Sequence, residues 1–93
     1  MSTRVLTADC RNIATPAALQ VYLGYVLRAP SWYGENLDAL YDILTECARP
    51  TRLVLCMPQA ADAEMAAYLP RLRRVLDDAQ QACPAFEWAE AKA

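Results

Sequence analysis

The strongest strand signal in the sequence is the run Arg52 to Met57, RLVLCM, which is nearly all apolar and is closed by Pro58. A run of this kind, too short for a typical helix and rich in branched aliphatic residues, favours an extended strand. Strands that are hydrophobic on both sides are typical of sheets whose two faces are covered. The run therefore predicts a buried strand with other elements packed on both of its faces.

Two further segments favour extended structure, one near each end of the chain: Arg4 to Ala8 (RVLTA) and Phe86 to Glu90 (FEWAE). Helical patterns separate the three strand candidates, and strands connected by helices pair in parallel through right-handed crossovers. The expected fold is α/β, with a small three-stranded parallel sheet packed by about four helices in one domain spanning residues 1–93.

Helix boundaries are marked by residues that cap or interrupt helices. Thr15 and Asn36 are good N-caps, and Pro16 and Pro70 fit the first turn of a helix. Pro30, Pro50 and Pro84 each follow a helical pattern and end it. The sequence predicts helices over residues 16–28, 37–47, 59–65 and 68–83.

Residues 31–46, SWYGENLDALYDILTE, combine an aromatic loop with an amphipathic helix, and they hold four acidic residues but no Lys or Arg. With about 100° per residue, the apolar side chains gather on one side of this helix. These are Leu37, Leu40, Ile43 and Leu44, while the opposite side holds Asp38, Asp42 and Glu46 with Tyr41 and Thr45 beside them.

A helix face with a single sign of charge has a cost, because like charges four residues apart destabilise a helix by about 0.2–0.5 kcal/mol per pair. One interpretation is a solvated face made polar by acids. The other is an acidic surface kept for a basic partner. The charge pattern alone leaves both open.

The segment Tyr33 to Thr45, YGENLDALYDILT, resembles the signature of barstar, the intracellular inhibitor of barnase-type ribonucleases. The similarity is nearly continuous there, with Tyr41 where barstar has tryptophan. Outside this stretch it rests on the order of the elements, the chain length and a late helix ending near Cys83. The resemblance implies the same three-stranded parallel sheet and a 1:1 complex between a monomeric inhibitor and a small basic ribonuclease.

The resemblance also implies how such a complex forms: a helix carboxylate occupies the phosphate position of the basic active site and blocks it. The expected partner-binding residues are Trp32, Tyr33, Gly34, Asn36, Asp38, Tyr41, Asp42, Thr45, Glu46 and Asp78. Two positions depart from barstar. Glu46 replaces a glycine, and Ala82 stands where the long helix of barstar carries a second acid.

Several of these residues have a structural interpretation as well. Trp32 could equally cover the end of the first helix, and Tyr33 could serve partly as a core residue. Asn36 is a helix cap before it is a contact. Asp42 is hardest to explain structurally, because it lies in the middle of the helix and faces away from the apolar side. An acidic binding module with a partner other than a ribonuclease is the alternative function.

Catalysis, metals and nucleic acids find little support in the sequence. The chain has no histidine, no glycine-rich phosphate loop and no nucleophile motif, so we expect neither an enzyme nor a cofactor. The cysteines lack the close pairing of a zinc site. Arg71, Arg73 and Arg74 form only a small basic cluster, which argues against direct nucleic-acid binding.

The four cysteines, Cys10, Cys47, Cys56 and Cys83, are compatible with two disulfides in a secreted protein. The N-terminal segment lacks the long apolar run of a signal peptide, and no segment is apolar over the length that a membrane span needs. We therefore expect a cytoplasmic protein with reduced thiols and no membrane association.

Overall fold

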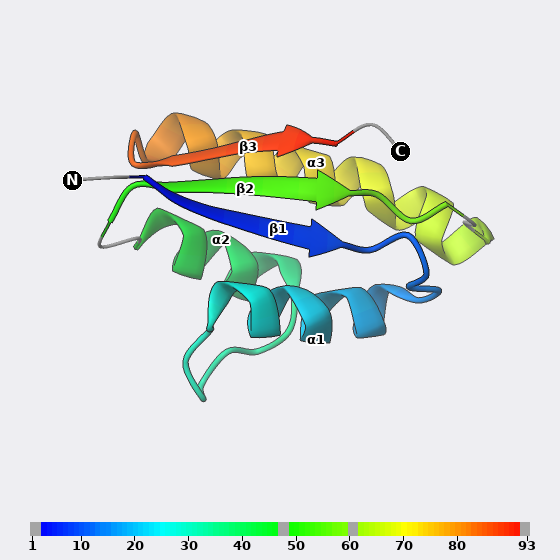
Figure 1. Ribbon diagram of the computed structural model, residues 1–93. Helices are drawn as coiled ribbons and strands as arrows, with labels where there is room; N and C mark the ends of the chain where they lie inside the picture. The colour runs from blue at the N-terminus through cyan, green and yellow to red at the C-terminus, as the bar shows by residue number, and fades with distance from the viewer. Residues whose placement is uncertain (1–2, 47–48, 60–61, 92–93) are drawn as a thin grey trace.

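The computed structural model describes residues 3–46, 49–59 and 62–91. The elements follow the order β1 (Arg4–Asp9), α1 (Pro16–Leu27), α2 (Leu37–Thr45), β2 (Thr51–Cys56), α3 (Ala63–Ala82) and β3 (Phe86–Glu90) (Figure 1). All three strands lie in one parallel sheet of order β1-β2-β3, which confirms the predicted α/β fold. Cys47, at the predicted end of the second helix, lies outside the described residues.

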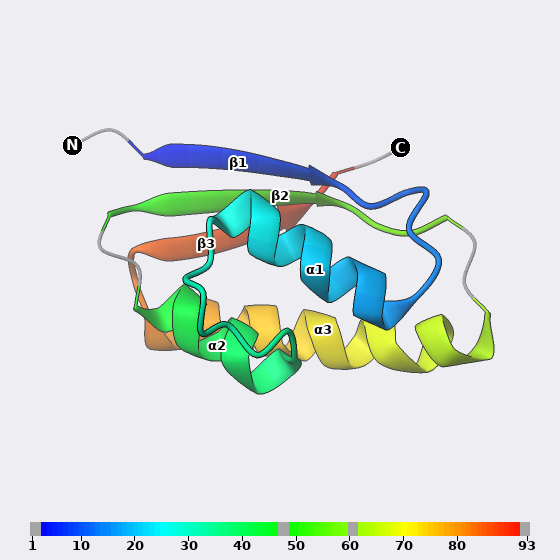
Figure 2. The same ribbon diagram turned by 90° about the horizontal axis from the view of Figure 1, so that it is seen from below.

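The central strand β2 is covered on one face only, so the prediction that both its faces are packed was wrong. Thr51, Leu53 and Leu55 are buried, whereas Arg52 between them is exposed. Figures 1 and 2 show α1, α2 and α3 on the same face of the sheet. The strand order explains this arrangement: successive right-handed crossovers that step in one direction place every helix on the same side. Val54 and Cys56 stay partly buried because strands flank them on both sides.

The core lies between this face of the sheet and the three helices. It is built almost entirely from aliphatic side chains, with Phe86 as its one fully buried aromatic ring among the described residues. The helices contribute Leu19 and Leu23 from α1, Leu40 and Leu44 from α2, and Met65, Leu69, Leu72, Leu76 and Ala79 from α3. The binding-helix candidate α2 is thus attached to the core by leucines on its apolar side.

The third helix is longer than expected. It runs continuously from Ala63 to Ala82, where the sequence predicted a short helix over 59–65 and a separate one from residue 68. Asp62 caps it, with Oδ1 accepting a hydrogen bond from the Met65 amide at 2.9 Å. Pro70 lies inside the helix on its exposed side, not in a first turn. Burial of Leu69 and Leu72, on the two sides of Pro70, offsets the backbone hydrogen bond that proline cannot donate. Because one long helix replaces the two predicted ones, the described residues contain three helices and not four.

Candidate protein-binding interface

The loop between α1 and α2 is folded tightly by backbone hydrogen bonds. Arg28 ends α1 in the left-handed conformation, with φ of 54°. The amide of Ala29 donates to the carbonyl of Gly24 at 2.8 Å, and the amide of Tyr33 donates to the carbonyl of Pro30 at 3.0 Å. Glu35 is also left-handed, with φ of 55°. The loop therefore returns the chain to α2 along a defined path.

Asn36 begins α2 as its N-cap. Its Oδ1 accepts a hydrogen bond from the amide of Ala39 at 2.8 Å, and its Nδ2 donates to the carbonyl of Gly34 at 3.3 Å. Asp38 follows in the first turn, where the helix dipole favours a negative charge. The capping role predicted for Asn36 is confirmed, and its exposed position leaves the side chain accessible.

The two sides of α2 differ sharply in exposure. Leu40 and Leu44 are 0% exposed, whereas Asp38, Asp42 and Glu46 are all exposed. Within the described part of the chain the ion pairs join Arg11 to Asp9, Arg52 to Glu87 and Arg73 to Glu90, so none involves an acid of α2. The predicted acidic face is present, and its carboxylates have no ion-pair partner among the described residues.

Tyr41 and Thr45, which lie beside the acidic face, make more contacts within the protein than its acids do. Tyr41 is half-buried and packs against the core. The hydroxyl of Thr45 donates to the carbonyl of Tyr41 at 2.9 Å and lies 3.2 Å from that of Asp42. Thr45 therefore already satisfies its hydroxyl within the helix.

The two aromatic residues of the loop, Trp32 and Tyr33, differ in exposure. Trp32 is 61% exposed, so it is not a core residue, and it lines a hollow together with Leu27 and Arg28 at the end of α1. Tyr33 is half-buried, and its hydroxyl donates to Oε1 of Gln20, a buried residue of α1. Burial, and then the neighbouring Tyr68 and Glu35, raise the pKa of Tyr33 to about 12. Sequence reasoning missed Gln20, although a polar residue next to Leu19 on the apolar side of a helix is a signal that could have revealed it.

Two hollows bring positive charges to the ends of the acidic face. One, of about 260 Å³, is lined by Asn36 and Asp38 together with Arg71 of α3. The other, of about 210 Å³, is lined by Trp32 and Glu46 together with Arg4 and Arg28. The segment 31–46 itself contains no Lys or Arg, but the fold brings three arginines from other segments into the hollows that Asp38 and Glu46 line.

Asp78 stands apart from the other predicted residues because it lies on α3, which packs against α2. Its side chain is exposed. The preceding residue, Asp77, is engaged differently: its Oδ1 accepts a hydrogen bond from the indole nitrogen of Trp88 at 2.9 Å. Of these two neighbouring acids, Asp78 is the one whose carboxylate forms no hydrogen bond or ion pair to a described residue.

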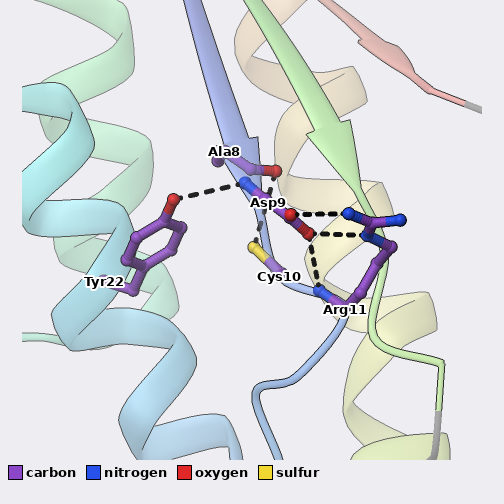
Figure 3. A network of polar contacts seen from close by, with 5 residues as sticks. All are labelled: Ala8, Asp9, Cys10, Arg11 and Tyr22. Carbon is purple, nitrogen blue, oxygen red and sulfur yellow. Dashed lines mark hydrogen bonds and ion pairs between the residues drawn. The ribbon is translucent and has the colours of Figure 1, made fainter.

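A separate polar network lies at the C-terminal end of β1, around Asp9 (Figure 3). The hydroxyl of Tyr22 accepts a hydrogen bond from the amide of Asp9 at 3.2 Å. The Arg11 guanidinium donates to both carboxylate oxygens of Asp9 at 2.9 Å, and these hydrogen bonds lower the pKa of Asp9 to about 2. Cys10 beside it is buried, which raises the pKa of its thiol to about 11. This network joins β1 to α1 and offers no activated nucleophile.

Over residues 3–46, 49–59 and 62–91, no group of acidic or cysteine side chains is arranged to hold a metal ion. Cys10, Cys56 and Cys83 are free thiols, and Cys47 falls outside the described residues. None of the described helices combines the length and the apolar character that a membrane span requires.

A search among curated proteins found no match for this sequence. A comparison with protein-family models gave a match to the family described as barstar (barnase inhibitor), over residues 3–92. The match spans the three strands, the three described helices and the acidic face of α2. The chain therefore belongs to the barstar family.

Proposed function

We propose that the protein inhibits a barnase-type ribonuclease by placing the acidic face of α2 over the active site of the enzyme. The observation that carries this proposal is the arrangement of α2, whose exposed carboxylates lie opposite the fully buried Leu40 and Leu44. A helix attached in this way presents its charges in a fixed position, which lowers the entropy lost on binding. The membership of the barstar family supplies the class of partner.

The electrostatic logic follows from the substrate of such an enzyme. A ribonuclease binds RNA phosphates, so its active site gathers cationic side chains. A carboxylate can take the place of a phosphate and form charge-assisted hydrogen bonds with those cations. Clustered acids also accelerate the encounter with a basic surface. Inhibition would then be competitive, because RNA and inhibitor occupy the same site.

Asp42 is the best candidate for the residue that enters the phosphate position. It lies between Asp38 and Glu46 along the helix, and it lines neither of the two hollows that contain arginines. Trp32 and Tyr41 would supply aromatic contacts around it. Gly34, Asn36 and Thr45 would shape the surface, while Tyr33 and Asp78 would complete it from the loop and from α3.

The test is inhibition of a panel of small barnase-like ribonucleases in a fluorogenic RNA assay. We expect tight inhibition of at least one enzyme, and we expect Asp42→Asn to weaken it strongly. Glu87→Gln is the matched control, because it also removes one exposed negative charge, but it follows the buried Phe86 in β3, so its side chain points to the uncovered face of the sheet. Equal effects of the two substitutions would contradict the proposed site.

One observation favours a second function, an acidic binding module whose partner is not a ribonuclease. Arg71, Arg4 and Arg28 line the hollows at the two ends of the acidic face, so cationic side chains share these hollows with its outer acids. A partner with a mixed charge pattern would suit such a surface. Lack of inhibition across the panel, together with failure of a co-expressed ribonuclease to co-purify, would favour this alternative.

A further inference from the structure

A buried amide connects three segments that are far apart in the sequence. Gln20 of α1 is 2% exposed. Its Nε2 donates a hydrogen bond to the hydroxyl of Tyr68 on α3, and its Oε1 accepts one from the hydroxyl of Tyr33 in the loop before α2. A buried polar side chain is costly unless it is hydrogen-bonded. Both ends of the Gln20 amide have a partner, so the loop is attached to the core through the Tyr33 hydroxyl.

The ring of Tyr33 is held by a second feature of α1. A Cβ atom at position 24 would lie 2.9 Å from Cε2 and 3.0 Å from Cδ2 of Tyr33, closer than real Cβ atoms normally approach. The ring therefore rests against the helix backbone at Gly24. Glycine is a poor residue for a helix interior, and the close approach of this ring gives a reason for its presence here.

Tyr33 occupies the middle of the loop that leads to the candidate interface. Trp32, with 61% of its surface exposed, precedes it, and Asn36, the N-cap of α2, follows three residues later. If the Tyr33 ring left its place, the middle of the loop would lose its side-chain contacts with α1, and the backbone hydrogen bond from Ala29 to Gly24 would hold only the start of the loop.

We propose that Gln20 and Gly24 are positioning residues for partner binding: they fix Tyr33 on α1 and so hold the 28–36 loop in its binding conformation before the partner arrives. The proposal rests on the proposed function for its binding consequence. Neither residue need touch the partner. They act by raising the fraction of molecules whose loop is ready to bind, and that fraction scales the apparent affinity.

The decisive variant is Gly24→Ala, because the added methyl group displaces the Tyr33 ring while alanine itself suits a helix. We expect the dissociation constant for the inhibited ribonuclease to rise by about tenfold or more, since it varies inversely with the competent fraction. Gly24→Ala is then repeated in a Tyr33→Ala background. There it should have little further effect, because the ring it displaces is already absent. Equal losses in both backgrounds would overturn the proposal.

Gln20 is tested through the hydroxyl that it binds. Gln20→Leu removes both amide hydrogen bonds, and Tyr33→Phe removes only the hydroxyl of Tyr33. We expect each variant to weaken binding, and we expect the double variant to weaken it by less than the product of the two separate factors. Multiplicative losses would mean that Gln20 does not act through Tyr33.

A measurement without ribonuclease separates the two proposals. Trypsin can cleave after Arg28, which is exposed at the start of the loop, and after Arg11, which is exposed in a different loop. We expect Gly24→Ala to accelerate cleavage after Arg28 and to leave cleavage after Arg11 unchanged. Unchanged cleavage after Arg28 would overturn the positioning role even if inhibition were intact. If the wild-type protein inhibits no ribonuclease but Gly24→Ala still accelerates cleavage after Arg28, the proposed function is refuted and the loop attachment stands.

Discussion

At the scale of single residues, the three acids of α2 differ in what surrounds them. Asp38 and Glu46 each line a hollow together with arginine side chains, whereas Asp42 lines neither. An exposed carboxylate near a cation has part of its charge offset, although solvent screens such a pair strongly. We therefore expect substitution of Asp42, which shares neither hollow with an arginine, to weaken inhibition more than substitution of Asp38 or Glu46.

Asp42→Ala should weaken inhibition by several orders of magnitude without unfolding the protein. Removing one partner of a desolvated charge pair typically costs about 2–5 kcal/mol or more, because the cations of the other protein stay buried and unpaired. The size of the effect follows the resemblance to barstar, which has an aspartate at the matching position. Alanine suits a helix, and one repulsion between like charges disappears. An inhibition constant and a thermal melt check both parts, and unchanged inhibition would exclude the phosphate-mimic role.

Asp9 should titrate well below an ordinary aspartate. Its hydrogen bonds from Arg11 hold its pKa at about 2, against about 3.9 for an unperturbed aspartate. Because the folded pKa is the lower one, this interaction stabilises the protein above the unfolded pKa and is lost as the pH falls towards 2. The carboxyl carbon shift of Asp9, followed by NMR against pH, measures the value. Arg11→Gln should return the pKa towards the ordinary value, and a normal pKa in the unmodified protein would contradict the pairing.

At the scale of elements, α2 depends on its apolar side for its position. The helix has only nine residues, from Leu37 to Thr45. Isolated helices of this length are unstable in water, so tertiary packing must supply most of the stability. Leu40 and Leu44, both fully buried, provide that packing, and the Asn36 cap adds a local contribution. The acidic face is therefore positioned by residues that cannot touch a partner.

Leu40→Ala should destabilise the protein by about 2–5 kcal/mol, through lost burial and the cavity left behind. This is a large part of the stability of a small domain. Urea unfolding gives the free energy, with Asp42→Ala as a control on the opposite side of the same helix. A loss below about half a kcal/mol would be far smaller than a buried leucine should give and would mean that α2 does not pack on Leu40.

At the scale of the whole molecule, the acidity is local. The formal net charge is only −2 over 93 residues. Arg4 of β1, Arg28 at the end of α1 and Arg71 of α3 line hollows together with the outer acids of the acidic face, and the uncovered sheet face carries the Arg52–Glu87 pair. Attraction of a basic partner must then come from the field of α2 and not from the overall charge.

Association with the ribonuclease should therefore be fast and sensitive to salt. The Debye length falls from about 30 Å at 0.01 M to about 10 Å at 0.1 M ionic strength, which screens a local field at the distances where steering acts. Stopped-flow measurements across this range should show association slowing steeply and dissociation changing less. An association rate independent of salt would argue against α2 as the docking surface.

Much of this protein is determined by short stretches of sequence. The caps Thr15 and Asn36, the strand at residues 51–56 and the two-sided pattern of α2 all follow from residues within a few positions of one another, because capping and periodicity are local. The resemblance to barstar also lies in one continuous segment. These features were predictable, and they include the acidic face itself.

Other features were decided only by the tertiary structure. The sequence does not state the order of the strands, yet that order left one face of β2 uncovered. Packing of leucines kept Pro70 inside α3. The arginines beside the acidic face come from distant elements, and the contact of Gln20 with Tyr68 spans 48 residues. Such contacts depend on which surfaces the compact chain brings together, and no local pattern encodes them.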